Sequence, residues 1–552
     1  PLPHKSRGIS RGAMSTRDVH QAGRSMSISR NMELTASCLV ILYSFYVVLS
    51  RGATLSAEFE AGGPRQRLLK GLGKGWMFGR SVDLSDAQWR AFRGNLPLLA
   101  AAMGAFIIVS LVVRKAAPSQ LLAVHLLFSF AYVGYAHGAR SLFLLSLVLL
   151  NYHLAHSCKG KAYGPAMVWA FNCSALFLVR LYSGFAFHSI SPSLAFLDAY
   201  DGPQRWDICF NMVMLRCISF GLDLHGAIRG SGVKEAIEAN KKAPVPQQKQ
   251  QQQSSLPLES YSLPTYLAYL FYPPLYVAGP IITFNSYAAQ LKGLTPRPGL
   301  WATAAYCARL SASLLVLEAM THTLYFNAIA KQKVWRRWEA GNAAGSGGGL
   351  GFSVADLGIT GFWVLNFMWL KFLVIWRFFR CCALLEGISP PENMLRCVNN
   401  NYDIEGFWRG WHASYNRWLV RYLYIPLGGT SRRSLIIWVV FTFVALWHDL
   451  EWKMLGWAYL TCLCFTPELG VKWAMKQPWA AGLRARWWYR YAAGVGATAN
   501  ITMLMTANLL GFVTGMDGIP DFLRVLGQDR VFLAGVLITF FASAQVMFAI
   551  RE

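Results

Sequence analysis

The sequence predicts an all-α polytopic membrane protein, because hydrophobic residues dominate the chain and recur in long runs. Of the 552 residues, 54% are hydrophobic and 14% are charged, whereas charged residues make up roughly 25% of a typical soluble domain. Several runs fall at or below the ~17–25 residues that a simple spanning helix needs, so some are expected to be re-entrant or broken. We expect roughly ten to twelve transmembrane or re-entrant helices. The apolar runs are 34–50, 95–113, 119–135, 141–156, 164–179, 206–222, 301–317, 354–370, 434–447, 492–513 and 531–549.

The net charge of +25, from 52 Lys and Arg against 27 Asp and Glu, does not indicate nucleic-acid binding, because the basic residues gather on no soluble domain. They lie in the N-terminal tail, in the 51–93 connection and between later apolar runs. That is the pattern of cytoplasmic connections beside anionic membrane lipids. Examples are Arg7, Arg11, Arg65, Arg67, Lys70, Lys74, Arg80, Lys472 and Lys476. The eleven cysteines lie mostly in or beside apolar runs, and no spacing indicates a metal site.

The chain divides into four parts. Residues 1–32 are rich in Ser and Arg without periodicity, and we expect a disordered basic cytoplasmic tail. A first group of membrane helices occupies 33–229. A low-complexity linker with a glutamine run follows at 230–258. The second group of helices occupies 259–552.

One interruption in the second group suggests an internal chamber. Tyr272, Pro273 and Pro274, then Gly279 and Pro280, break an otherwise apolar stretch. Irregular backbone at membrane depth survives only where it is buried in protein or lines a cavity. A broken helix beside a chamber is therefore one interpretation, and a simple proline kink is equally compatible with the sequence.

The segment 405–424 combines aromatic, basic and imidazole side chains, and its spacing predicts one helix. Its aromatic residues recur at three- and four-residue steps, which gives one aromatic face that includes Trp408 and Trp411. His412 lies on this face with Asn416 one turn above it. Arg409, Arg417 and Arg421 fall at multiples of four and would form a cationic stripe suited to phosphate. The alternative is an interfacial helix whose arginines reach lipid phosphates.

A second histidine, His448, ends the apolar run 435–447, in which Thr442 is the one polar side chain. Burial there favours a neutral imidazole that can accept a proton. Its neighbours Trp447, Asp449 and Glu451 are candidates for contact or orientation. Together with the 405–424 segment, His448 is the best candidate general base of the chain. Other ionisable groups beside apolar runs are expected to pair with one another or else to line a substrate path. These are Arg180, Arg216, Asp223, Arg309, Glu318 and Lys371.

These motifs resemble a known family. FWRGWHASYNRWLVRYLYIPLGG (407–429) followed by ALWHDL (445–450) is similar to the signature region of the membrane-bound O-acyltransferase family. The chain most resembles its Gup (glycerol uptake protein) branch, which is related to hedgehog acyltransferase. Further resemblance lies in VDLSDAQWRAFRGNLPLL (82–99), YPPLYVAGPIITFNSY (272–287) and WRFFRCCALLEGISPPENMLRCVNNNY (376–402).

The resemblance implies a catalytic core at 376–450 and a tunnel that crosses the membrane. His448 would be the catalytic histidine, and His412 would occupy the second active-site position. The expected co-substrate is acyl-CoA, reaching the tunnel from the cytosol, with no other cofactor and no metal. The acceptor would be a lipid hydroxyl. Gup proteins are implicated in re-acylating lyso-phosphatidylinositol in GPI anchors, so the expected acceptor is lyso-phosphatidylinositol or lyso-GPI and the expected location is the endoplasmic reticulum membrane.

On this interpretation His448 takes the acceptor proton, and His412 with Asn416 orients the donor or stabilises the oxyanion. Arg409, Arg417 and Arg421 would hold phosphates of CoA or of a lipid headgroup. Trp408, Trp411 and Trp447 complete the expected substrate-binding set. Two alternatives stay open from sequence. One is a glycerol and proton transporter, since Gup proteins have also been described as glycerol transporters. The other is a non-catalytic regulator of another acyltransferase.

Overall fold

The computed structural model describes residues 16–61, 69–230, 255–336 and 352–551, with side chains from residue 30 onward. Within these residues, eleven helices are long and apolar enough to cross a membrane, and each overlaps one of the predicted apolar runs. The all-α polytopic prediction is therefore confirmed. The eleven are α1 (Thr16–Glu60), α2 (Ala87–Ala116), α3 (Leu121–His137), α4 (Ser141–Cys158), α5 (Gly164–Leu181), α6 (Trp206–Arg229), α12 (Leu300–Thr323), α15 (Val354–Glu386), α18 (Arg433–His448), α21 (Tyr489–Leu509) and α23 (Arg530–Arg551).

The shorter elements connect these helices or fill the space between them. β1 (Leu72–Gly73) and β2 (Val82–Asp83) form one small antiparallel pair. The short helices are α13 (Phe326–Lys331), α16 (Ile404–Gly410), α17 (Ala413–Leu419), α20 (Ala481–Arg484) and α22 (Ile519–Leu526). Two 3₁₀ segments, η3 (Phe187–Ser189) and η4 (Pro192–Ala199), join α5 to α6.

Two differences from the sequence analysis concern helix boundaries. Helix α1 begins at Thr16, so residues 16–32 are helical rather than part of a disordered tail; residues 1–15 lie outside the described chain. A further long helix, α19 (Trp452–Ala474), packs against α18 and α21. Its buried Glu468 and its Lys472 lower its apolar character, which is why no apolar run marked it.

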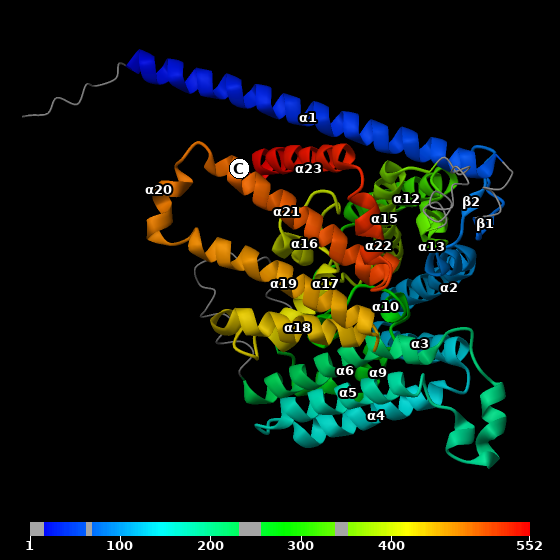
Figure 1. Ribbon diagram of the computed structural model, residues 1–552. Helices are drawn as coiled ribbons and strands as arrows, with labels where there is room; N and C mark the ends of the chain where they lie inside the picture. Colours follow the sequence, from blue (N-terminus) through cyan, green and yellow to red (C-terminus); the bar gives the residue numbers. More distant parts are fainter. Residues whose placement is uncertain (1–15, 62–68, 231–254, 337–351, 552) are drawn as a thin grey trace, which may run out of the picture.

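The two predicted groups of membrane helices do not form separate units in space. Helix α1 packs along α23, and α2 packs against α15, so the beginning of the chain lies against its end (Figure 1). Residues 231–254 of the predicted linker lie outside the described chain.

The interruption at 272–280 is a broken helix, as one of the two interpretations predicted. Three short buried helices, α9 (Leu263–Leu270), α10 (Pro273–Tyr276) and α11 (Phe284–Leu291), replace a single span. The guanidinium of Arg216, buried on α6, donates hydrogen bonds to the carbonyls of Leu270 and Leu275 on either side of the break. A buried cation thus satisfies carbonyls that an unbroken helix would have bonded internally.

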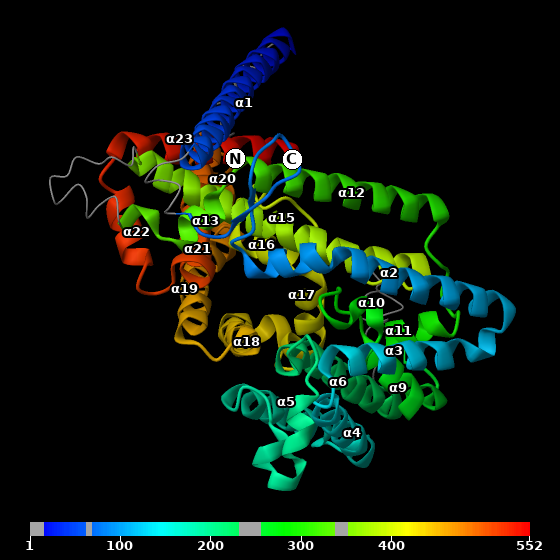
Figure 2. The ribbon, with the colours of Figure 1, turned by 90° about the vertical axis from the view of Figure 1, so that its right-hand side faces the viewer.

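Helices α1, α6, α18 and α19 run along the left–right direction of Figure 1, whereas α2, α12 and α15 run across the view in Figure 2. The ends of the first set define two sides of the molecule. In Figure 1, α20 and the end of α19 lie at the left, whereas β1, β2 and α13 lie at the right. We call the left side the basic side, because α6 ends there and α18 begins there among many cations. These are Lys159, Lys161, Arg229, Arg432, Arg433, Lys472, Lys476, Arg484, Arg486 and Arg490. The opposite side is called the distal side, and α5 and α18 both end on it. The positive-inside rule identifies the basic side as the one expected to face the cytoplasm.

The described cations of the 51–93 connection lie near the end of α1 that is remote from Thr16. Residues 51–60 of this connection belong to α1 and residues 87–93 to α2, and β1 and β2 between them lie on the distal side (Figure 1), which faces the viewer in Figure 2. Arg80 in this connection pairs with Glu60 at 3.0 Å, so part of the local positive charge is neutralised within the protein.

Candidate active site

The segment that carries His412 is not one helix. Helix α16 ends at Gly410, α17 begins at Ala413, and a π-helical turn, η6 (Val420–Tyr424), follows directly. His412 adopts φ 45° and ψ 48°, in the left-handed region. A residue other than glycine pays about 1–3 kcal/mol there, and such strain concentrates at functional sites. The prediction of a continuous helix over 405–424 is therefore wrong, and the break falls at the histidine itself.

Asn393 holds this break in place. Its carbonyl accepts a hydrogen bond from the Ala413 amide at 2.9 Å, and its Oδ1 accepts from both the amide (3.2 Å) and the hydroxyl of Ser414. The same Ser414 hydroxyl oxygen accepts from the Ile281 amide at 2.9 Å. The turn at His412 is thus fixed by the buried Asn393 and by the broken helix at 272–280, and not by its local sequence.

The other end of the segment is tied to α19. Glu468 accepts hydrogen bonds from the backbone amides of Ile404 (2.7 Å) and Glu405 (3.4 Å) at the start of α16. Lys472 pairs with Glu468 at 2.7 Å and with Asp403 at 2.6 Å. A carboxylate at a helix N-terminus satisfies amides that have no partner within the helix.

The imidazole of His412 lies among aromatic rings. It stacks on Trp376 with ring centroids 4.4 Å apart and an interplanar angle of 20°, and Tyr415 lies 5.2 Å away. Within the described chain its Nε2 is buried without a hydrogen-bond partner. Burial, and secondarily the neighbouring His448, lowers the pKa of His412 to about 3. The ring is therefore neutral near pH 7 and keeps one nitrogen as donor and the other as acceptor.

His448 is the last residue of α18, and two side chains fix the backbone around it. The side-chain amide of Asn211 on α6 donates to the backbone carbonyl of Trp447 at 2.6 Å, and the backbone carbonyl of Asn211 accepts from the Trp447 indole at 2.9 Å. Arg180 on α5 donates to the carbonyl of His448 at 3.4 Å. Within the described residues no hydrogen bond joins Asp449 or Glu451 to the imidazole; Asp449 caps the Leu450 amide and Glu451 pairs with Lys453.

Both histidines line one cavity of about 1500 Å³. The indole of Trp447 lies between them, 6.4 Å from the His412 ring and 4.8 Å from the His448 ring. A cavity of this size exceeds the roughly 300–1,000 Å³ of common small-molecule pockets. Its walls are mostly apolar side chains of α1, α15, α21 and α23, so a long hydrocarbon chain fits their chemistry.

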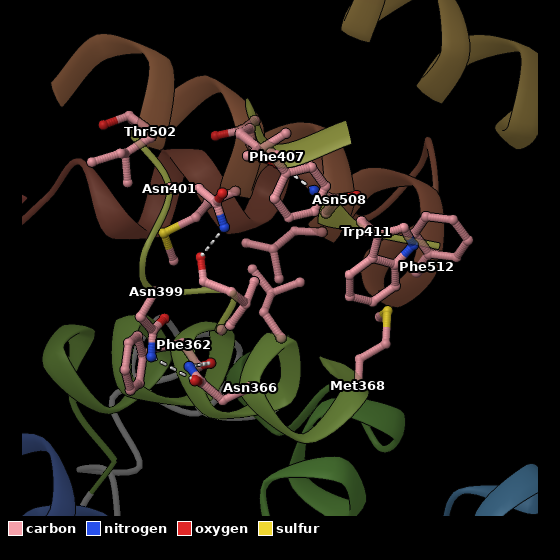
Figure 3. Close-up of a pocket in the computed structure, with 18 of the residues that line it drawn as sticks. Phe362, Asn366, Met368, Asn399, Asn401, Phe407, Trp411, Thr502, Asn508 and Phe512 are labelled. Atoms are coloured by element: carbon pink, nitrogen blue, oxygen red, sulfur yellow. Dashed lines mark hydrogen bonds between the residues drawn. The ribbon is translucent and has the colours of Figure 1, made fainter. Parts of the chain in front are cut away.

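Figure 3 shows a part of this cavity where amides lie among aromatic and sulfur-containing side chains. Asn366 and Asn399 are joined by a hydrogen bond of 2.7 Å, and Phe362, Met368 and Phe512 lie around the same space. The lining is therefore apolar with a few hydrogen-bonding groups, as a site for an amphipathic substrate requires.

The structure separates the predicted substrate-binding residues into two sets. Trp408, Trp411, Trp447 and Asn416 line the cavity with the two histidines. Arg409, Arg417 and Arg421 do not line it.

The three arginines point elsewhere because the helix breaks at His412. Arg409 is 71% exposed and pairs with Glu405, Arg421 pairs with Asp223 at 2.8 Å, and Arg417 is exposed. Their predicted place beside His412 depended on a continuous helix, and among the described residues they do not join the two histidines in the cavity wall.

Three residues that shape the site, namely Asn211, Trp376 and Asn393, had no role predicted from the sequence. Arg180 did stand out as a charge beside an apolar run. The expectation of structural pairing holds for Asp223 with Arg421 (2.8 Å) and for Lys371 with Asp86 (2.9 Å). Glu318 likewise pairs with Arg93 at 2.6 Å. Arg180 has no carboxylate partner in the described chain and lines the cavity instead.

Comparison with known proteins agrees with this geometry. Residues 162–340 and 353–513 match the membrane-bound O-acyltransferase family. The membrane-bound O-acyltransferase GUP1 of Saccharomyces cerevisiae is 38% identical over 500 residues, covering 87% of this chain and 84% of that protein. The corresponding gup1 protein of Schizosaccharomyces pombe is 35% identical over 498 residues, covering 87% of this chain and 82% of its own length.

A more distant relative is the mouse protein-cysteine N-palmitoyltransferase HHAT, 28% identical over 230 residues, covering 40% of this chain and 42% of that protein. The family match spans both histidines and the broken helix that supports His412, and the two GUP1 relatives cover most of the chain. This multi-pass membrane chain belongs to the membrane-bound O-acyltransferase family and is an acyltransferase.

Proposed function

We propose that this enzyme transfers a long-chain acyl group from acyl-CoA to a hydroxyl of lyso-phosphatidylinositol, free or within a lyso-GPI anchor, in the endoplasmic reticulum membrane. His448 removes the hydroxyl proton while the oxygen attacks the thioester carbonyl carbon. The carbon–sulfur bond then breaks, and the CoA sulfur leaves with the proton that His448 had taken. The products are the acylated lipid and free CoA, and His448 returns to its neutral form.

The observation that carries this proposal is that both histidines line a single, largely apolar cavity. An acyl chain and a lipid acceptor each require an apolar surface, while the reaction requires one proton acceptor where they meet. The neutral His412, with Nε2 unpartnered in the described chain, has an N–H or a lone pair available for the substrate. Aimed at the thioester oxygen, such a donor contributes about 10²–10³-fold to the rate.

A hydroxyl acceptor is favoured over a protein acceptor by how much of this chain aligns with each kind of relative. The proteins named O-acyltransferases align with most of this chain, whereas the protein-cysteine N-palmitoyltransferase aligns with 40% of it. The choice of a lyso-phosphatidylinositol or lyso-GPI acceptor, and of the endoplasmic reticulum, follows from the resemblance to the Gup branch.

The test uses the purified full chain in lipid nanodiscs with labelled palmitoyl-CoA and lyso-phosphatidylinositol. Wild type is expected to form labelled phosphatidylinositol, and His448→Ala is expected to lose at least 100-fold in kcat. The matched control is His153→Ala, because His153 is an exposed histidine of α4 that does not line the cavity. Absence of transfer by wild type, together with glycerol uptake that survives in His448→Ala, would contradict the proposal and favour transport.

A further inference from the structure

Arg180 is a cation that lines the cavity without a counter-charge. Within the described chain no carboxylate lies within ion-pair distance of its guanidinium. Among the residues that the structure describes, its one hydrogen bond is the 3.4 Å contact with the carbonyl of His448, and its Nε is buried without a partner. A partly buried guanidinium that is neither paired nor fully hydrogen-bonded is costly unless a ligand supplies the missing acceptors.

The position of Arg180 relates it to the reacting end of the cavity. Arg180 and Asn211 bond consecutive backbone carbonyls, those of His448 and Trp447, so they flank the end of α18 from two different helices. Asn211 also has a buried Oδ1 without a partner in the described chain. The guanidinium of Arg180 therefore contacts the backbone of His448, the proposed general base.

Arg180 lies on the distal side, where α5 and α18 both end. CoA carries its phosphates on the end of the molecule remote from the thioester. If acyl-CoA reaches the site from the basic side, as the positive-inside rule expects of a cytosolic substrate, those phosphates lie away from Arg180. The phosphate that reaches the distal end is then one carried by the acceptor.

We infer that Arg180 binds the phosphate of a lysophospholipid acceptor and thereby places the acceptor's free hydroxyl beside His448. This inference rests on the proposed function and names the headgroup chemistry that the site selects. In a lysophospholipid with a free central hydroxyl, that hydroxyl and the phosphate ester oxygen are on adjacent glycerol carbons. A phosphate at Arg180 therefore brings the hydroxyl to the end of α18. The guanidinium suits this task because it donates two parallel hydrogen bonds to phosphate oxygens.

The experiment compares two acceptors that offer the same hydroxyl, lyso-phosphatidylinositol and the uncharged monoacylglycerol. In Arg180→Gln the KM for lyso-phosphatidylinositol is expected to rise at least tenfold, since a charged hydrogen bond is lost. The KM for palmitoyl-CoA and the KM for monoacylglycerol are expected to change by less than about twofold. Arg180→Lys keeps the charge without the fork and is expected to give an intermediate KM.

The matched control is Arg140→Gln, which removes another distal-side cation that pairs with Asp201 at 3.4 Å and does not line the cavity. It is expected to leave all three KM values unchanged. A rise in the KM for palmitoyl-CoA in Arg180→Gln would assign the phosphate to CoA and overturn the inference. A fall in kcat with both acceptor KM values unchanged would also overturn it, because Arg180 would then only position His448.

Failure of the proposed function gives a different result. If wild type acylates monoacylglycerol but not lyso-phosphatidylinositol, the proposed acceptor is wrong and the inference falls with it. If wild type acylates neither, direct binding decides the inference. Fluorescent lyso-phosphatidylinositol should then bind wild type at least tenfold more tightly than Arg180→Gln, with both variants checked for monodisperse folding by size-exclusion chromatography. Equal binding would overturn the inference independently of turnover.

Discussion

His412 lies at a break between two short helices, whereas His448 ends an uninterrupted helix of sixteen residues. The first depends on a left-handed backbone that Asn393 and Ser414 hold in place. The second has ordinary helical backbone, and Asn211 and Arg180 bond the carbonyls beside it. One imidazole is thus oriented by a strained turn and the other by the end of a regular helix. The two should therefore respond differently to the same substitutions.

The largest expected effect separates the two roles by chemistry. His448→Gln retains a polar side chain but cannot accept a proton near pH 7, so kcat should fall by about 10²–10⁴-fold. His412→Asn retains a donor and an acceptor and tolerates the left-handed backbone, so kcat should fall by about tenfold or less. The measurement is steady-state acyl transfer with both substrates varied. Equal losses in the two variants would contradict the assignment of His448 as the base.

The next effect tests the support of the strained turn. Asn393→Ala removes the Oδ1 that accepts two hydrogen bonds from Ser414, and the buried donors left behind cost about 1–3 kcal/mol. A lower melting temperature and a kcat reduced about tenfold are expected. Asn95→Ala, at an exposed asparagine of α2, serves as the control and should match wild type. Unchanged kcat in Asn393→Ala would show that the turn at His412 needs no such support.

A third comparison uses backbone preference alone. Glycine adopts a positive φ freely, whereas alanine does not, so His412→Gly should be more stable than His412→Ala by about 1 kcal/mol. At His448 the order should reverse, because its backbone is helical and glycine is there less favourable than alanine, by less than the roughly 1 kcal/mol of a helix interior since His448 is the last helical residue. Chemical or thermal unfolding of the four purified variants checks both orders. The same order at both positions would contradict the difference in backbone.

The acid stability of the fold should also depend on His412. Its pKa is about 3 in the folded protein against 6.5 for an unperturbed histidine. The unfolded chain thus binds this proton at higher pH, and acidification from about pH 6.5 downward favours unfolding. Above pH 6.5 the group contributes no pH dependence. The drop in melting temperature between pH 7 and pH 4.5 should therefore be smaller in His412→Asn than in wild type. The exposed-histidine variant His153→Ala should follow wild type, and parallel curves for His412→Asn would rule out a buried neutral ring.

The smallest effect concerns the arginines that lie outside the cavity. Arg409→Ala removes an exposed ion pair with Glu405, and such pairs contribute about 0–1 kcal/mol. Stability and the KM for palmitoyl-CoA should stay close to wild type. A large increase in that KM would mean that the cationic stripe predicted from the sequence binds CoA phosphate from the surface of the protein.

The eleven apolar spans could be predicted from hydropathy, and both histidines stood out by their motifs. The prolines at 272–280 marked an interruption, but they did not decide between a broken helix and a kink. The break at His412 left no local signal, since it is set by contacts with Asn393 and Ile281, distant in the chain. The positions predicted for Arg409 and Arg421 beside the aromatic face were wrong for the same reason. The role of Arg180 depends on the absence of a partner, and only the packed structure shows which charges find one.

Because Glu468 on α19 caps the start of α16, the active site requires more of the chain than the signature region. A fragment that ended after residue 450 would still contain both histidines and the whole signature region. It would lack the carboxylate that caps the first amides of α16, as well as Lys472, which pairs with that carboxylate. The start of the segment that carries His412 would then have exposed, unsatisfied amides. The smallest fragment that keeps this cap on α16 therefore extends into α19.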